Sequence, residues 1–339
     1  MAAFFKGIGI FFGMIMLVIL LGCVILGINT LRLNNWSFDF KKPAEEVVLT
    51  DDFDDIFIET TTADVTILRS ENEECKVVYK FGNFGITADV KVEDGVLKIK
   101  SLDGRKWYEH LTFGSFGSYI QVYLPESVYK ALNVDISTGD VEIREGFTFD
   151  TITVTGSTGD FSCYSTGKNL VRYDGSTGDV DVAGITTESL YLKVSTGEVD
   201  VKNISAKTVY IKTTTGDIDV ENLNGSALEV VVGTGEVEIE NARIDSFTSK
   251  GTTGEISLDN VIVAGKITIE RGTGDVELFG CDGGEIEIET TTGEVECSLL
   301  SGKMFTANTG SGKVRVPEST EGGRCKITTS TGSIKVTIK

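Results

Sequence analysis

Apolar and polar residues alternate in two short stretches that return every 19 or 20 residues from residue 132 to the end of the chain. Strict alternation predicts a β-strand with one buried face, so each unit predicts two short strands. A Thr-Gly pair, in most units preceded by Ser or Thr and followed by an acidic residue, separates the two strands of a unit. Its glycines are Gly139, Gly159, Gly178, Gly197, Gly216, Gly235, Gly254, Gly274 and Gly293, and more degenerate copies follow at Gly312 and Gly332.

Each unit also predicts two tight bends. The Thr-Gly corner supplies a residue that adopts positive φ without a Cβ clash. A second bend is expected six residues after the glycine, because Gly and Asn enter the left-handed region most readily. The residues at this position are Gly184, Asn203, Asn222, Asn241, Asn260 and Gly280.

Two strands and two bends in 19 residues make one flattened coil, and self-similarity at so short a period is typical of stacked architectures. We therefore predict an all-β fold, a two-sheet β-solenoid (β-helix) of 19–20-residue coils over residues 132–339. Neighbouring coils would stack about 4.8 Å apart, with Val180, Val199 and Ile218 in one interior column. A β-propeller is excluded because one blade needs four strands and about 40 residues.

The first 43 residues have a different pattern. Residues 7–29 form an almost unbroken apolar run between Lys6 and Arg32, and about 20 apolar residues span a bilayer as a helix. We expect a tail at residues 1–6, one transmembrane helix at 7–29 and a juxtamembrane linker at 30–43. A cleaved signal peptide is disfavoured because no small-x-small site follows the run. Lipidation at Cys23 is disfavoured because residues 24–28 stay apolar.

Residues 44–131 predict an irregular β lead-in that caps the solenoid. Residues 56–68 resemble a worn copy of the repeat with Ala63 in the glycine position, and Gly139 follows four periods later. We therefore expect a first coil followed by inserted strands. Within the insertion, Asp94-Gly95 between two alternating segments predicts a hairpin, and residues 119–124 predict another strand before Pro125. Atypical terminal units are expected to cover the open core of a solenoid.

Acidic residues that directly follow the repeat glycines would stack into a file with one carboxylate per coil. A candidate divalent-cation site along this file competes with a simpler interpretation, in which outward charges keep the sheet soluble and oppose lateral aggregation. The simpler interpretation is favoured because known calcium-binding β-helical repeats are glycine-rich nonapeptides, which this phrase does not match. The file comprises Asp140, Asp160, Asp179, Glu198, Asp217, Glu236, Glu255, Asp275 and Glu294.

Histidine and cysteine offer little support for catalysis. The only histidine lies in an aromatic, glycine-rich segment that could equally be a cap packed by its own rings or a ligand-contact loop. The candidate contact residues of this loop are Trp107, Tyr108, His110, Phe113 and Phe116. Cys163, Cys297 and Cys325 occupy inward repeat positions, where a free cysteine acts as a small apolar residue. We predict no cofactor, no metal centre beyond the acidic file and no enzymatic activity.

Charge changes sign near the C-terminal end. Residues 134–302 hold 31 acidic and 11 basic side chains, whereas residues 303–339 hold 2 acidic and 7 basic ones. We expect the last coil to expose an unpaired edge that these cations guard against end-to-end association, or to form a basic tip that contacts an anionic polymer. The candidate tip residues are Lys313, Arg315, Arg324, Lys326 and Lys335. A net charge of −20 disfavours nucleic acid as a partner.

From residue 53 to 339 the chain resembles a bacterial family of "putative adhesins" with β-strand repeats, a domain of unknown function. The resemblance lies in Phe-Asp-Asp-Ile at 53–56, Thr-Ala-Asp-Val-Thr-Ile at 62–67, Tyr-Leu-Pro at 123–125 and the Thr-Gly-Asp phrases. With the apolar N-terminal segment, the chain looks most like LiaG-type envelope proteins of Gram-positive bacteria, some of which are linked to envelope stress. The resemblance implies a solenoid placed outside the cytoplasm and brings no catalytic residues. Positive-inside counting leans weakly the other way.

We therefore expect a membrane-anchored, non-enzymatic β-solenoid of the bacterial cell envelope, acting as an adhesin-like or envelope-stress-associated surface protein. Its expected partners are the membrane, through the single-pass anchor, and cell-wall or anionic envelope polymers or another envelope protein. One alternative is a cytoplasm-facing, bactofilin-like polymer. The other is a β-helical polysaccharide-acting enzyme, which would need a local cluster of carboxylates and a basic catalyst in a groove.

Overall fold

The computed structural model describes residues 43–82, 85–103, 117–319 and 321–339. The chain divides into two compact units, Met1–Pro43 and Ala44–Lys339. The expected transmembrane helix at 7–29 and the expected ligand-contact loop (Trp107, Tyr108, His110, Phe113 and Phe116) lie outside the described residues. Within the described ranges, no helix has the length and apolar character needed to cross a membrane.

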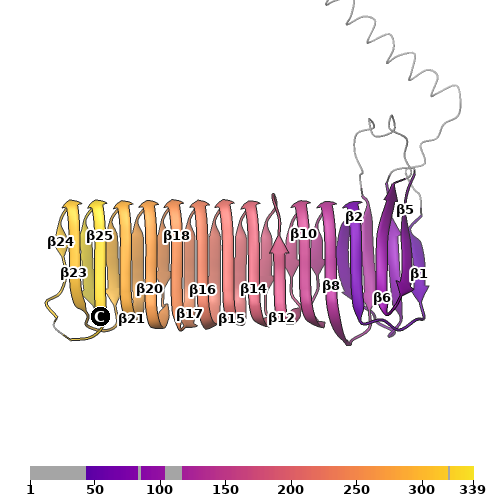
Figure 1. Cartoon of the computed structure of the whole chain (residues 1–339), viewed down its shortest axis with the longest axis horizontal. Coiled ribbons are helices and arrows are strands. Elements are labelled where there is room, and N and C mark those ends of the chain that lie inside the picture. Colours follow the sequence, from indigo (N-terminus) through magenta and orange to yellow (C-terminus); the bar gives the residue numbers. More distant parts are fainter. Residues whose placement is uncertain (1–42, 83–84, 104–116, 320) are drawn as a thin grey trace, which may run out of the picture. The chain divides into compact units, whose positions relative to one another are not determined.

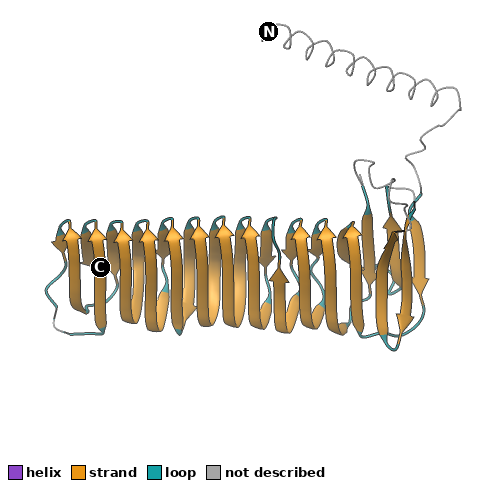
Figure 2. Cartoon of the chain, turned by 45° about the horizontal axis from the view of Figure 1, so that its top comes forward, coloured by secondary structure: helices purple, strands orange, loops and turns teal. Residues whose placement is uncertain are grey.

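The second unit consists of β-strands joined by tight turns (Figures 1 and 2). The strands are β1 Glu45–Leu49, β2 Asp55–Thr62, β3 Asp64–Arg69, β4 Cys75–Lys80, β5 Ile86–Glu93, β6 Val96–Asp103, β7 Tyr119–Leu124, β8 Val128–Thr138, β9 Val141–Ile143, β10 Thr148–Thr158, β11 Phe161–Cys163, β12 Thr166–Asp174, β13 Val180–Ala183, β14 Thr186–Thr196, β15 Val199–Thr215, β16 Ile218–Thr234, β17 Val237–Ile244, β18 Ser246–Thr253, β19 Ile256–Asp259, β20 Ile262–Thr273, β21 Val276–Thr292, β22 Val295–Leu299, β23 Met304–Ser311, β24 Val314–Arg315, β25 Arg324–Thr331 and β26 Ile334–Ile338.

Parallel pairing between equivalent strands of successive coils confirms the predicted two-sheet β-solenoid. Val180 of β13 pairs with Val199 of β15, and Val199 pairs with Ile218 of β16. All three side chains are buried, so they form the expected interior column. One continuous core of such columns runs through the unit, and the five described cysteines are buried in it with free thiols.

Both predicted bends are present. At the second bend Asn203 has φ +57° and Gly184 has φ +69°, and the strand bends there from one sheet into the other. At the Thr-Gly corner the glycines stack directly on one another. A Cβ atom on Gly216, whose φ is +137°, would lie 2.0 Å from the carbonyl oxygen of Gly197. Glycine is therefore required at this corner by its conformation and by the close approach of the coil beneath it.

The N-terminal end is built as the sequence predicts. Ile56 of β2 pairs with Leu132 of β8, so residues 55–69 form the coil that stacks directly on residues 128–143. The intervening residues extend beyond that coil, where β6 pairs with β2 and β7 pairs with β3. β5 and β6 form an antiparallel hairpin around Asp94 (φ +53°) and Gly95 (φ +76°), as expected. β4 pairs antiparallel with both β7 and β1, and this cap covers the core.

The C-terminal end corrects one expectation. The last coil in sequence, β25 and β26, does not lie at the end of the solenoid. β25 pairs with β21 on one side and β23 on the other, and β26 pairs with β22 and β24. A Cβ atom on Gly332 would meet the carbonyl oxygen of Gly293 at 1.9 Å, and one on Gly312 would meet that of Gly332 at 2.1 Å. The chain therefore forms the end coil, β23 and β24, first. It then returns and places its last coil, β25 and β26, between the end coil and β21–β22 (Figure 1). We call β25 and β26 the inserted coil.

Candidate functional site

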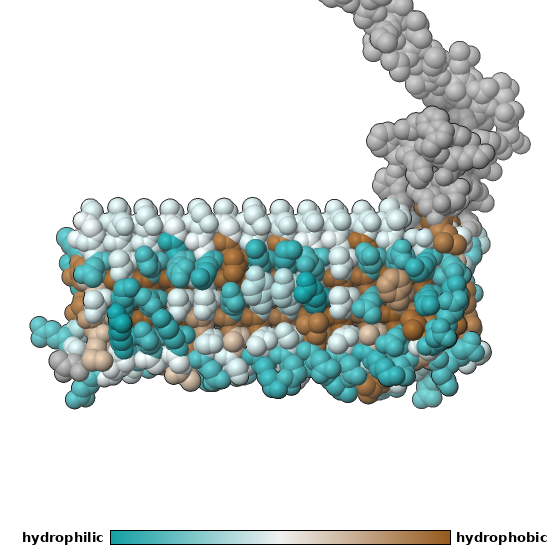
Figure 3. Space-filling view, in the orientation of Figure 1, coloured by the Kyte–Doolittle hydropathy of each residue, from teal (hydrophilic) through white to brown (hydrophobic). Residues whose placement is uncertain are grey.

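The acidic file directly follows the Thr-Gly corner of each coil that contributes to it. In the space-filling view, a regular row of residues of intermediate hydropathy runs along one edge of the solenoid (Figure 3). Several aspartates of the acidic file accept a hydrogen bond from a backbone N–H of the next coil. The Oδ1 atom of Asp140 accepts a hydrogen bond from the backbone N–H of Asp160 at 2.9 Å, and Asp160 accepts one from Asp179 at 2.8 Å. Asp179 accepts one from Glu198 at 2.9 Å. The same bond joins Asp217 to Glu236 and Asp275 to Glu294. These carboxylates satisfy corner amides, which gives the file a structural role.

Among the described residues, three carboxylate groups lie close together. One oxygen each of Glu198, Asp200 and Asp219 lies within 4.8 Å of the others. Burial, followed by the charges of Asp200, Glu238 and Glu198, raises the pKa of Asp219 to about 6. Carboxylate oxygens are the ligands that Ca²⁺ prefers, but the Lys202 ammonium already lies 3.3 Å from Asp200. Only Glu198 belongs to the predicted file, because Asp200 and Asp219 come from the next outward position along their strands.

The candidate basic residues are divided between two coils. Lys313 and Arg315 lie on the end coil. Lys326 and Lys335 lie on the inserted coil, where Lys326 pairs with Glu287 at 2.8 Å and Lys335 pairs with Glu296. Arg324 opens β25 and is exposed. Hydrogen bonds from Lys266 and Lys326 lower the pKa of Glu287 to about 2. The inserted lysines therefore neutralise the acidic coil beside them and do not form a continuous cationic surface with the end coil.

The end coil itself is an open edge. β23 and β24 each pair with one neighbouring strand on their inner side. Met304 is 49% exposed and Val314 is 41% exposed, while Phe305 and Val316 pack partly against the core. Unpaired strand edges with exposed apolar side chains are sites at which another chain can add. The repeat pattern does not reveal this surface, because it predicts the open edge one coil later in the chain.

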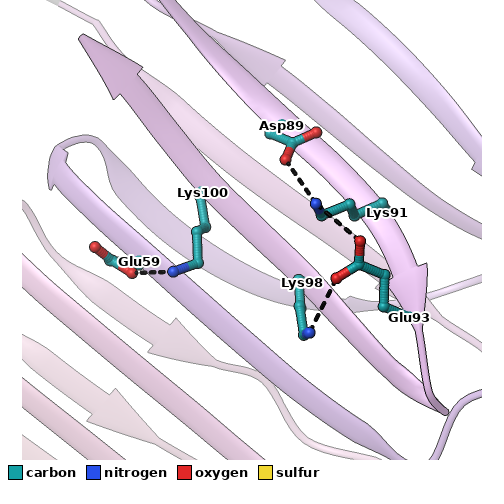
Figure 4. Close-up of polar contacts among 6 residues, drawn as sticks. All are labelled: Glu59, Asp89, Lys91, Glu93, Lys98 and Lys100. Carbon is teal, nitrogen blue, oxygen red and sulfur yellow. Dashed lines mark hydrogen bonds and ion pairs between the residues drawn. The ribbon is translucent and has the colours of Figure 1, made fainter.

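At the N-terminal end of the solenoid, the edge strand β5 carries charged side chains. β5, the outermost strand of its layer, carries Lys91 between Asp89 at 3.4 Å and Glu93 at 2.9 Å. Lys98 of β6 reaches Glu93 at 3.0 Å, and Lys100 reaches Glu59 of β2 (Figure 4). Exposed pairs of this kind contribute little stability, but charges along an edge strand oppose pairing with another molecule. The edge of β5 is therefore protected against pairing with another molecule.

A second feature that the sequence analysis missed is a stack of outward side chains across three coils. The Arg172 guanidinium lies 4.1 Å from the centre of the Tyr191 ring, and Tyr191 stacks on Tyr210 with centroids 5.0 Å apart. The recurrence of Tyr six residues before Gly197 and Gly216 was the available signal. Because both faces of Tyr191 are covered, this ring cannot stack on a sugar. The stack therefore stabilises the ladder of coils.

The described thiols are poor nucleophiles. Burial raises the pKa of Cys163 to about 12 and that of Cys281 to about 11. Since the thiolate is the reactive form, these cysteines act as apolar core residues. This matches the expectation for Cys163 from its inward repeat position.

Comparisons with known proteins give one family and several solved structures of low sequence identity. A family model described as Toastrack DUF4097 matches residues 53–227 and again residues 224–339. No curated protein matches the chain. A solved structure of a "putative adhesin" from Bacteroides fragilis is 12% identical, with a TM-score of 0.36, and the match covers 88% of this chain and 98% of that one. A "putative lipid binding protein" from Parabacteroides distasonis is 15% identical, with a TM-score of 0.37 and the same coverage of 88% and 98%.

Proposed function

This chain belongs to the Toastrack DUF4097 family, and from that premise we propose that it is a membrane-anchored, non-enzymatic β-solenoid of the bacterial cell envelope. It acts as an adhesin-like binding protein, with its contact surface at the end coil. One observation carries the proposal. The chain enters the solenoid at β1, and the open edge strands β23 and β24 lie at the other end (Figure 1).

An anchor at residues 7–29 would tether the β1 end, because only the linker 30–43 separates the two. The stacked coils between β1 and β23 share one core, so they act as a stiff spacer. A surface at β23 and β24 is then the part of the solenoid farthest along the chain of coils from the tether. This is the arrangement that a protein needs to reach a partner beyond the membrane surface.

The chemistry of the end coil supports a partner that is partly apolar and partly anionic. Met304 and Val314 expose apolar area there, and Lys313 and Arg315 add positive charge to a protein of net charge −20. An anionic cell-wall polymer or the strand of another envelope protein would satisfy both features. A link to envelope stress would use the same contact, with occupancy of the end coil as the signal.

Protease treatment of intact cells that express the full chain tests sidedness. Cleavage of the solenoid only after the cells are opened would refute the proposal. Co-sedimentation with isolated cell walls tests the surface, comparing the parent chain with the double variant Lys313→Glu, Arg315→Glu. The double variant Lys168→Glu, Lys207→Glu, at two exposed lysines on the side of the solenoid, is the matched control because it changes the net charge by the same amount. Equal sedimentation of all three proteins would refute the end coil as the contact.

The open edge also favours the alternative of a bactofilin-like polymer, because β23 and β24 could accept a second copy. Electron microscopy separates the two ideas. Filaments of the purified chain, with a solenoid protected from protease in intact cells, would support the polymer. The enzymatic alternative would require cleavage of an envelope polysaccharide that a single cluster of substitutions abolishes.

A further inference from the structure

The hydrophobic core reaches the surface at the end coil. The inward residues of β23, Phe305 and Ala307, pair with Cys325 and Ile327 of the inserted coil, which are fully buried. Phe305 and Ala307 themselves are only partly buried, and Val314 of β24 is 41% exposed. Among the described residues, no strand lies beyond β23 and β24. The last layer of the core therefore lacks the apolar cover that a further coil would give.

The same end leaves backbone groups of β23 open. The Met304 N–H donates to the Gly323 carbonyl oxygen at 2.9 Å, toward the inserted coil. Successive residues of a paired strand direct their backbone groups to opposite sides, so the N–H groups of Phe305, Ala307 and Thr309 point away from the inserted coil. A row of donors and acceptors at this spacing matches another β-strand.

The sequence of β23 does not oppose such pairing. Its eight residues, Met-Phe-Thr-Ala-Asn-Thr-Gly-Ser, contain no charged residue and no proline. Natural edge strands are often protected by charged side chains or proline, as β5 is by Lys91 and its two carboxylate partners. An added strand would therefore meet neither a like charge nor a missing donor along β23.

The segment around β23 is basic. Residues 297–317 contain three cations and no aspartate or glutamate. One of the cations, Lys303, is buried against Asp282 at 2.6 Å. Lys313 and Arg315 are exposed, and they have no ion pair within the part of the chain that the structure describes. They hold the first and third positions after the corner glycine, where most other coils carry Asp or Glu.

Equivalent positions in neighbouring coils already pair cations with carboxylates. Lys335 of the inserted coil is aligned with Glu296 of β22 and forms an ion pair with it. Arg315 is aligned with Lys335 on its inner side. An acidic residue at the same position of an added segment would therefore pair with Arg315 as Glu296 pairs with Lys335. A second copy of the end coil would instead bring like charges together, which is destabilising in a sheet.

We propose that the end coil binds an extended, acidic segment of a partner protein by β-strand addition. The segment adds to β23, covers the open core with apolar side chains at alternate positions, and places acidic residues beside Lys313 and Arg315. This inference rests on the proposed function, which puts the contact surface at the end coil, and it names the class of partner. An anionic glycan or a lipid surface could neutralise the two cations, but neither presents backbone donors and acceptors at the spacing of a strand.

Fluorescence anisotropy of a labelled peptide with the full chain in detergent tests the proposal. The acidic peptide copies residues 228–240, Leu-Glu-Val-Val-Val-Gly-Thr-Gly-Glu-Val-Glu-Ile-Glu. It carries the apolar alternation of a coil, with Glu236 and Glu238 at the first and third positions after the corner glycine. The reversed peptide carries Glu236→Lys and Glu238→Lys. We expect saturable binding of the acidic peptide and several-fold weaker binding of the reversed one, because two exposed ion pairs are replaced by repulsion.

Two variants of the chain separate the contribution of charge from that of the open edge. Lys313→Glu with Arg315→Glu should weaken binding of the acidic peptide and strengthen binding of the reversed one. The control Lys168→Glu with Lys207→Glu should change neither affinity. Ala307→Pro removes an N–H that points away from β25 and keeps the bonds between β23 and β25. It should weaken binding of the acidic peptide several-fold or more with no change in charge.

No saturable binding of the acidic peptide to the parent chain would overturn the inference, and so would equal affinities of the two peptides. Full binding by Ala307→Pro would also overturn it, because the charges alone would then suffice. If Ala307→Pro does not fold, the charge-reversed chain decides: a switch of preference to the reversed peptide supports the inference, and an unchanged preference overturns it. A chain that sediments with cell walls through Lys313 and Arg315 but binds neither peptide would keep the proposed function and refute this inference.

Discussion

Replacing one corner glycine tests whether the stacking of backbone on backbone holds the solenoid together. In Gly216→Ala the new Cβ atom would lie 2.0 Å from the carbonyl oxygen of Gly197, at a φ of +137°. The backbone conformation costs an L-residue about 1–3 kcal/mol. The contact adds about 1–3 kcal/mol, as over-packing does in a core, because the neighbour is backbone and cannot swing aside. We therefore expect a loss of about 2–6 kcal/mol in the free energy of unfolding.

Gly184→Asn is the matched control. Gly184 also has positive φ, at +69°, but a Cβ atom there would meet nothing within 4 Å. The equivalent bend already holds asparagine in other coils, as at Asn203 with φ +57°. This variant should stay within about 0.5 kcal/mol of the parent, as surface substitutions usually do.

Urea unfolding of the two variants, followed by circular dichroism, measures the difference. Because repeat proteins can unfold in parts, hydrogen exchange of the strands next to Gly197 and Gly216 should show where protection is lost. A Gly216→Ala protein that unfolds within 1 kcal/mol of the Gly184→Asn protein would refute the stacking argument. Such a result would mean that neither the close contact nor the positive φ at this corner carries the cost assigned to it.

Three further predictions concern the corner acids and the C-terminal end. Asp160→Ala removes the acceptor of the Asp179 N–H and should lower the free energy of unfolding in urea by about 1 kcal/mol. Asp160→Asn keeps an oxygen there and should lower it less. Equal losses in the two variants would contradict this role. Burial and nearby carboxylates raise the pKa of Asp219 to about 6 from 3.8, so its ionisation destabilises the folded state increasingly as the pH rises from 3.8 through 6. Asp219→Asn should then raise the thermal midpoint near neutral pH but leave it unchanged near pH 4, and a gain of equal size at both would exclude the titration. Deleting residues 324–339 should abolish amide protection in β23 and β24 although both strands remain, and full retention would show that the inserted coil is dispensable.

The regular part of the fold could be predicted because its cause is local and repeated. The inward positions of Val199 and Ile218, the bend at Asn203 and the pairing of residues 55–69 with 128–143 all follow from spacing. The order of the last two coils does not, because Gly312 and Gly332 keep the same period whichever coil lies outside. β24 ends at Arg315 and β25 begins only at Arg324, whereas other coils pass this point through a short bend at Asn or Gly, and this longer interval is a local sign that the chain turns back.

The inserted coil has a physical consequence for the end of the solenoid. If the chain ended on the outermost coil, that coil would be held by pairing on one side and would fray from its terminus. Here the outermost strands β23 and β24 are connected to the chain at both ends, and the later strand β26 lies between β22 and β24. An exposed edge can therefore persist at this end without unravelling, which is what a contact surface at β23 and β24 requires.

A side chain that departs from the repeat is harder to predict from the sequence than one that recurs in several coils. The corner glycine, which recurs in the coils, is accounted for by backbone stacking, and the aspartates that follow it in several coils are accounted for by the backbone N–H that each bonds. Arg271 recurs nowhere, and the small residues Ser249 and Gly251 in the coil before it make its space. No single-coil pattern predicts it, because its guanidinium and its space come from different coils. The guanidinium is buried on the core side of the sheet, at a position that holds Val232 in one coil and Thr290 in another, so the repeat itself does not require a charge there.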